Sequence, residues 1–212
     1  MSQTISVCIM ALYFIMRQAR NMPKLGMEPI RKAQLIDATL ESVERYGLQN
    51  TTVATICKIA GLSPGIISHY FGGKQQLIEA TVWYLIKSLQ TELLKKLNEQ
   101  PGVGHKERLN LLIDSNFSQI QTTTKASATW LSFWAQACHD PALARLQLIN
   151  ERRLFSNIKY SIKHLVEEDV VDIKSHTLAA MIDGLWMRGS LEYGTVDLEQ
   201  ASSICKHFVN SL

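Results

Sequence analysis

From residue 28 onward the hydrophobic positions recur every three or four residues, which is the period of an amphipathic α-helix. The pattern predicts nine helices, at about 28–46, 53–60, 64–71, 74–99, 105–121, 124–138, 140–167, 172–192 and 197–211. No segment carries the alternation or the Gly/Asn hairpin signals typical of a β-sheet. The sequence therefore predicts an all-α fold.

The two short helices predicted at 53–60 and 64–71 are separated by a tight turn. Thr52 suits the N-cap of the first, and Gly61 supplies the left-handed residue that ends it. Ser63 and Pro64 follow as a predicted N-cap and first helical residue of the second. Two helices joined so closely must cross steeply, which is the geometry of a helix-turn-helix with its second helix in the DNA major groove.

The second short helix has two distinct faces. Ile67, Tyr70 and Phe71 are expected to pack inward because they lie three to four residues apart. The positions left facing outward are Ser63, Pro64, Gly65, Ile66, Ser68 and His69. A helical hairpin inside an all-α core is the alternative interpretation. The caps, the turn and the small outward residues agree with one another in favour of DNA binding.

The composition is that of a globular protein, with 46% hydrophobic and 19% charged residues among 212. The net charge is only +3, so DNA binding must rest on a local cluster and on the pairing of two copies. The four cysteines are far apart and form no CxxC pair. Isolated cysteines are typical of small buried hydrophobes in a reducing compartment, with a redox sensor as the alternative.

Residues 5–16 form an apolar run that is too short for a transmembrane helix, which needs about 20 residues. No basic residue precedes the run, as a secretory signal would require. Since Met22 opens a plausible natural start, residues 1–21 are expected to be an upstream extension outside the fold. A membrane-anchored regulator is the alternative. The expected division is a helix-turn-helix domain at 22–73, with the motif at 52–71, and a second domain at 74–212.

The helix predicted at 74–99 is long enough to join the two domains, since it spans on the order of 30 Å. Its apolar stripe consists of Ile78, Val82, Leu85, Leu89, Leu93 and Leu97. A movement at the far end of this helix would be carried to the helix-turn-helix domain, so a signal from a bound ligand could pass along the helix.

Aromatic residues gather in the second domain. Trp130, Phe133 and Trp134 share one helix, Trp186 lies beside Asp183 on a later helix, and Asp114 and Phe117 lie on an earlier one. Tryptophan faces bind quaternary ammonium groups, and a carboxylate could add charge. Helical spacing by itself favours the other interpretation, in which these aromatics fill a helical core.

An enzyme is the rival from another class. The six histidines show no HExxH or other metal-ligand spacing, and the chain has no GxSxG elbow or glycine-rich phosphate loop. We therefore expect no catalytic residues, no metal site and no cofactor.

The segment TTVATICKIAGLSPGIISHYFGGKQQLIEA resembles the head of the TetR family of bacterial repressors. Within that family, four segments in order resemble the choline-responsive repressors of glycine betaine synthesis. They are MPKLGMEPIRKAQLIDATLE, GIISHYF, WLSFWAQACHDPALARLQLINERRLFSNI and AAMIDGLWMRGSL. The resemblance begins at Met22. It implies a cytoplasmic repressor of genes that convert choline to glycine betaine, modulated by choline. The alternative is a TetR-type repressor that responds to another cationic or hydrophobic molecule.

The resemblance also implies roles for individual residues. Thr52, Tyr70 and Lys74 would contact phosphates, while Gly65, Ile66, Ser68 and His69 would approach the bases. Many family members have Thr or Ser at the position of Ile66, so this chain would use apolar contact with a thymine methyl there. The last two helices, with a stripe of Leu178, Ile182, Leu185 and Gly189, would form a homodimer that reads palindromic double-stranded operator DNA.

Overall fold

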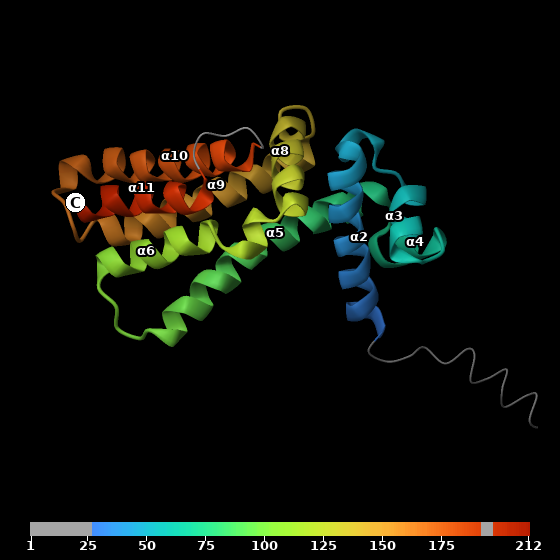
Figure 1. Cartoon of the computed structure of the whole chain (residues 1–212), viewed down its shortest axis with the longest axis horizontal. Coiled ribbons are helices and arrows are strands. Elements are labelled where there is room, and N and C mark those ends of the chain that lie inside the picture. The colour runs from blue at the N-terminus through green and yellow to red at the C-terminus, as the bar shows by residue number, and fades with distance from the viewer. Residues whose placement is uncertain (1–26, 192–196) are drawn as a thin grey trace, which may run out of the picture. The chain divides into compact units, whose positions relative to one another are not determined.

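The computed structural model describes residues 27–191 and 197–212 (Figure 1). Its elements are α2 (Met27–Asn50), α3 (Val53–Ala60), α4 (Gly65–Phe71), α5 (Lys74–Glu99), α6 (His105–Asn116), α7 (Gln119–Thr122), α8 (Thr124–Ala137), α9 (Pro141–Ile162), the 3₁₀ turn η1 (Glu168–Val170), α10 (Val171–Ser190) and α11 (Leu198–Asn210). Among these residues all regular structure is helical, which confirms the predicted all-α class. The expectation for residues 1–21 lies outside the described residues.

The chain divides into two compact units, residues 1–33 and 34–212. In the first, the described residues are the opening turns of α2, where Lys32 and Glu28 form an ion pair at 2.7 Å. All contacts discussed below belong to the second unit. The sequence-based boundary between residues 73 and 74 falls between α4 and α5 and stays a prediction.

The local signals around the two short helices act largely as predicted. Thr52 accepts a hydrogen bond from the Thr55 backbone N–H, and the Thr55 hydroxyl accepts one from the Thr52 backbone in return. Gly61 ends α3 with φ 64°. Gly47 interrupts α2 with φ 74°, where the predicted helix ends. The predicted cap at Ser63 is wrong. Pro64 holds the cap position and makes no side-chain cap bond, so α4 begins one residue later.

Two helices predicted for the second domain, residues 74–212, are shorter in the structure than expected. The predicted helix 105–121 breaks after Asn116, because Phe117 leaves helical geometry and packs against two clusters of buried hydrophobic residues, one around Leu109 and one around Trp130. The predicted helix 140–167 ends at Ile162, and a turn leads to η1. Neither break carries a glycine or proline, the residues that mark helix ends most clearly in a sequence.

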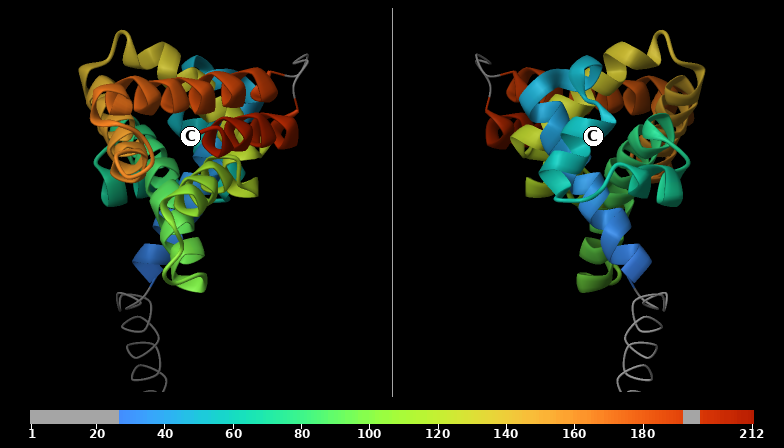
Figure 2. Two further views of the ribbon diagram at one scale, coloured as in Figure 1. Left: turned by 90° about the vertical axis from the view of Figure 1, so that its left-hand side faces the viewer. Right: turned by 90° about the vertical axis from the view of Figure 1, so that its right-hand side faces the viewer.

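Three apolar clusters hold the second unit together. The first joins α2, α3, α4 and the start of α5 around Leu35, Ile56, Ile67 and Leu77. The second lies along the first half of α5 and includes the aromatic residues of α8 and α10. The third fills the space among the rest of α5 and α6, α9, α10 and α11. The pair α10–α11 and the pair α9–α10 lie side by side (Figures 1 and 2).

The predicted dimer stripe on α10 is wrong in part, because Leu178 and Ile182 are buried in the third cluster of their own chain. The large hydrophobic side chains that α10 and the residue after it leave exposed are Ile173, Met187 and Leu191, with Ile204 on α11. Among the described residues, no helix is both long and apolar enough to cross a membrane.

Polar contacts tie α5 and α8 to neighbouring helices. Lys125 on α8 lies 3.3 Å from Asp37 and 3.4 Å from Glu41 on α2. Gln75, in the first turn of α5, donates to Asp140 at 2.7 Å, and the other oxygen of Asp140 caps α9. The helix that carries the aromatic residues is therefore in direct contact with α2.

Candidate ligand cavity and DNA-binding face

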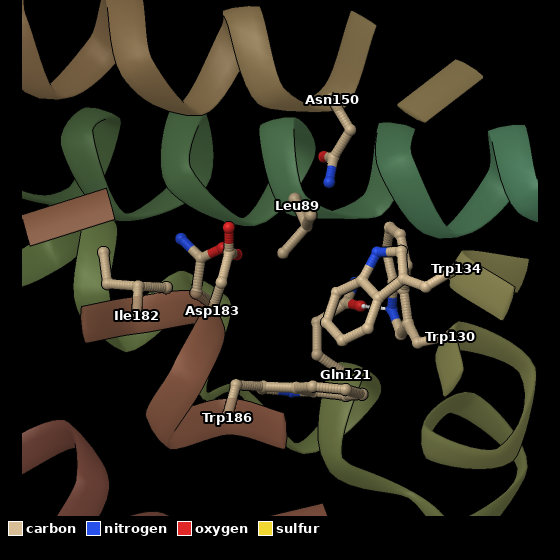
Figure 3. A pocket seen from close by; sticks show the side chains of 9 residues that line it. Leu89, Gln121, Trp130, Trp134, Asn150, Ile182, Asp183 and Trp186 are labelled. Carbon is tan, nitrogen blue, oxygen red and sulfur yellow. Dashed lines mark hydrogen bonds between the residues drawn. The ribbon is translucent and has the colours of Figure 1, made fainter. Parts of the chain in front are cut away.

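Three tryptophans surround one cavity between α5, α8, α9 and α10 (Figure 3). Trp130 and Trp134 are 6.0 Å apart between ring centroids, and Trp186 lies 6.5 Å from the first and 5.4 Å from the second. Trp186 stands nearly perpendicular to both. The space among the lining atoms is about 320 Å³, including its open mouth. The three indoles therefore line a space that suits one small occupant.

The polar edges of two of these indoles are engaged by glutamines. The Trp130 N–H donates to Gln121 Oε1 at 2.8 Å, and the Trp134 N–H donates to Gln147 Oε1 at 3.1 Å. Because buried indole N–H groups need an acceptor, these bonds fix the ring orientations. The three rings line the cavity, and their faces carry the negative part of the quadrupole that attracts a cation.

Gln121 connects the cavity wall to the long helix α5. Its side chain is fully buried, and its Nε2 donates to the Leu85 carbonyl at 3.2 Å and to the Ser88 hydroxyl at 2.6 Å. One amide therefore joins the ring of Trp130 to the backbone of α5. This residue was absent from the sequence-based candidates, because glutamine at a helix break carries no recognisable motif.

Asp183 supplies the negative charge at the cavity (Figure 3). Its side chain is open to solvent at the mouth, yet protein atoms surround most of the carboxyl. This desolvation raises the pKa of Asp183 to about 6, with a further increase from the negative charge of Glu151. Near neutral pH the carboxylate is the predominant form, and a bound cation would favour it further.

A wider cleft adjoins the cavity and shares Trp134 and Asp183 with it. It encloses about 1150 Å³ including open solvent, and its other lining includes Glu151, Gln147 and Met187. A ligand in the cleft would meet the carboxylates of Glu151 and Asp183 beside the indole of Trp134.

The structure divides the predicted ligand residues into two groups. Trp130, Trp134, Trp186 and Asp183 line the cavity. Phe133 is buried in the core beside Trp130, and Phe117 packs between the two body clusters. Asp114 lies elsewhere, paired with Lys206 at 2.6 Å. The lining residues that sequence reasoning missed are Leu89, Asn116, Gln121, Asn150 and Ile182.

The predicted DNA-contacting residues lie on α4 and at the starts of α3 and α5. Ser63, Pro64, Gly65, Ser68 and His69 are exposed, as expected for an outward face, and Thr52 is exposed as well. Ile66 and Tyr70 are only partly exposed, since both pack against the core of the short helices. A Cβ added at Gly65 would meet no atom of the chain within 4 Å.

Lys74, which is predicted to contact a DNA phosphate, also has a partner within the chain. Its ammonium donates to the Thr51 carbonyl at 2.9 Å, which ties the start of α5 to the residue before the α3 cap. This bond holds the ammonium beside Thr52 on one edge of the head. It uses one of three ammonium donors and leaves two for other acceptors.

Two short helices, α3 and α4, share one core and the second is largely exposed. The long helix α5 follows them and lines a ligand-sized cavity, so these features define a helix-turn-helix regulator with a ligand-binding domain. Comparison with protein families agrees. Residues 35–81 match the family of bacterial regulatory proteins of the tetR family, and residues 105–212 match the C-terminal domain of BetI-type transcriptional repressors. The chain belongs to the TetR family and is a BetI-type transcriptional repressor.

Individual relatives support the same assignment. The chain is 41% identical over 189 residues to the HTH-type transcriptional regulator BetI of Vibrio campbellii, covering 89% of this chain and 95% of that protein. It is 40% identical to the BetI regulator of Escherichia coli K12 over 188 residues, covering 89% and 96% of the two. Membership of this family confirms that the chain is a regulator and not an enzyme.

Solved structures share the fold. A TetR transcription regulator from Haloarcula marismortui superposes with a TM-score of 0.73 at 21% identity, covering 87% of this chain and 98% of that one. A protein from Saccharomonospora viridis, crystallised in complex with choline, superposes with a TM-score of 0.74 at 17% identity, covering 86% and 96%. At these identities the similarity concerns the fold alone.

Proposed function

We propose that this repressor controls genes for the conversion of choline to glycine betaine and that choline, bound in the tryptophan cavity, modulates its affinity for operator DNA. The observation that carries the proposal is the cavity itself, where three indole rings and one carboxylate line a single space. Choline has a quaternary ammonium group with no N–H donor. It is therefore recognised by ring faces and by charge, not by hydrogen bonds to nitrogen.

Two further observations support choline. The relatives at 40–41% identity are BetI regulators, and a protein of the same fold was crystallised with choline. The cavity also offers the amides of Asn116 and Asn150, which could bond the hydroxyl group of choline. A purely hydrophobic effector would leave the carboxylate of Asp183 without a counter-charge.

For the DNA side, we propose that α4 enters the major groove of a palindromic operator. Gly65, Ser68 and His69 would lie against the bases, with Ile66 on a thymine methyl. Thr52, Tyr70 and Lys74 would hold the phosphates, as Ser63 and Pro64 bring the chain into the groove. The open space around Gly65 supports this arrangement. Packing within the chain does not require glycine there, whereas a close approach to DNA does.

A palindromic operator requires two copies of the chain, with recognition helices about 34 Å apart. We propose that the exposed face of α10 forms the homodimer contact. Ile173, Met187 and Leu191 are 66%, 41% and 50% exposed and follow one face of the helix at intervals of 14 and 4 residues. On α11, which packs against α10, Ile204 is also exposed, at 37%. Such a repressor would act in the cytoplasm, where the chromosome lies.

Calorimetry with choline, together with operator binding in its presence and absence, tests the effector. Trp134→Ala should weaken choline binding about tenfold or more, because a desolvated cation–π contact contributes up to about 2 kcal/mol. Operator binding without choline should stay unchanged. Trp83→Ala is the matched control, since Trp83 is an exposed tryptophan of α5 that does not line the cavity.

Two results would overturn the effector assignment. One is the absence of choline binding at millimolar concentration. The other is an equal loss of affinity in the Trp134 and Trp83 variants. Binding of choline without any change in operator affinity would retain the site but reject its regulatory role. A larger hydrophobic cation that displaces choline from the cavity and acts more strongly would favour the alternative effector class.

A further inference from the structure

A second cavity lies between α5, α6 and α9. It shares Leu89 and Asn116 with the proposed choline site, but no tryptophan lines it. It encloses about 510 Å³ including its mouth. Leucines supply most of its lining, among them Leu93, Leu97, Leu112 and Leu154. The polar side chains that line it are amides and the guanidinium groups of Arg108 and Arg153. Its lining contains no carboxylate.

Neither arginine has an acidic partner among residues 27–191 and 197–212, where the ion pairs involve other cations. Arg153 donates to the Ile86 carbonyl of α5 and to Asn150 at 3.4 Å. Arg108 donates to the backbone oxygen of Asn157 at 2.9 Å and to its side-chain oxygen at 2.8 Å. All these acceptors are uncharged.

Burial of both guanidinium groups has an energetic cost. Desolvation lowers the pKa of Arg153 and the pKa of Arg108 from their ordinary values. A partly buried cation without a counter-charge is unfavourable. For Arg108 the ring of Tyr160, 4.7 Å from the guanidinium carbon, offsets part of this cost. If the arginines served only to bind carbonyl groups, neutral donors could do so without that cost. A negatively charged occupant would remove it.

We propose that this cavity binds an organic monocarboxylate with a hydrocarbon chain of medium length. The carboxylate would lie at the two guanidinium groups, which have N–H donors beyond those already used. The chain would lie along the leucines of α5. A short carboxylate such as acetate would leave this apolar lining without contact, and an uncharged alkyl compound would leave the arginines without a counter-charge.

Titration calorimetry with octanoate on the whole chain tests the site, with octanamide as the neutral ligand of the same length. Octanoate should bind saturably at one molecule per chain, and octanamide at least tenfold more weakly. Arg153→Met and Arg108→Met should each weaken octanoate binding at least tenfold. Arg152→Met is the matched control, because Arg152 is the exposed neighbour of Arg153 on α9 and its substitution removes the same charge. The octanoate affinity of the Arg152 variant should stay within twofold of that of the unmodified chain.

The proposal is overturned if octanoate does not bind saturably, if octanamide binds equally well, or if the Arg152 variant loses as much affinity as the Arg153 variant. Should the Arg153 variant fail to fold by circular dichroism, Leu94→Glu replaces it. Leu94 lines the cavity and is half exposed, so a carboxylate there is tolerated and should repel octanoate. Unchanged octanoate affinity in both Leu94→Glu and Arg108→Met would also reject the site. Choline titrated in parallel should bind the Arg108 variant normally.

Discussion

The charge of Asp183 should make choline binding depend on pH. The pKa of this carboxyl in the free protein is about 6, because burial and Glu151 both disfavour its ionised form. It is roughly 90% ionised at pH 7 and about 10% ionised at pH 5. Choline carries a fixed charge and does not titrate in this range. Its affinity should therefore rise with pH through about 6 and level off above pH 7.

The size of the effect follows from the position of the carboxyl at the cavity mouth. Two unit charges about 5 Å apart interact by roughly 3 kcal/mol at an effective dielectric constant of 20. Because Asp183 is exposed on one side, solvent screening reduces this to about 1–2 kcal/mol. Replacement by Asn should thus weaken choline binding at pH 7 by a factor of roughly 5–30.

Calorimetry from pH 5 to pH 8 measures both effects. Asp183→Asn should remove the pH dependence and hold the affinity near the value of the unmodified chain at pH 5. Asp114→Asn is the control, since Asp114 pairs with Lys206 and does not line the cavity. Equal choline affinity of the unmodified chain at pH 5 and pH 7.5, or a pH dependence that persists in the Asn variant, would refute this role of Asp183.

Three further outcomes are expected. Thr52→Ala removes the α3 cap and should destabilise the chain by about 1 kcal/mol, lowering Tm by roughly 2–4 °C in thermal unfolding; an unchanged Tm would mean that the cap adds nothing. Ile173→Glu should shift the chain from dimer to monomer in sedimentation, whereas a retained dimer would place the contact elsewhere. In thiol labelling of the native protein, exposed Cys138 should react well before Cys205, because burial raises the pKa of Cys205 to about 12; equal rates would contradict this burial.

The sequence was most informative where a local signal has one physical meaning. Thr52 and Gly61 mark the ends of α3 because a hydroxyl cap and a left-handed glycine act on adjacent backbone groups. The apolar stripe of α5 likewise predicted both ends of that helix. The breaks after Asn116 and Ile162 were missed, since they depend on packing with distant helices and leave no punctuating residue.

The ligand cavity was predictable only in part for the same reason. Trp130, Trp134 and Trp186 could be chosen by residue type, but spacing could not separate them from Phe133, which lies on the same helix and fills the core. Asp114 and Asp183 were equivalent candidates in the sequence. The structure distinguishes the two because Lys206 of α11 pairs with Asp114, whereas Asp183 lines the cavity.

The buried amide of Gln121 limits how strongly a bound effector and bound operator DNA can influence each other through Trp130. Three hydrogen bonds join the ring of Trp130 to α5 through that side chain. Of these three, the ring itself makes only the bond to Gln121, and one hydrogen bond adds about 0.5–1.5 kcal/mol net. An occupant that displaces the ring can therefore transmit about that much to α5 by this route. A coupling free energy of about 1 kcal/mol corresponds to a change in affinity of roughly fivefold. Thermodynamic reciprocity requires bound operator DNA to change the affinity for the effector by the same factor.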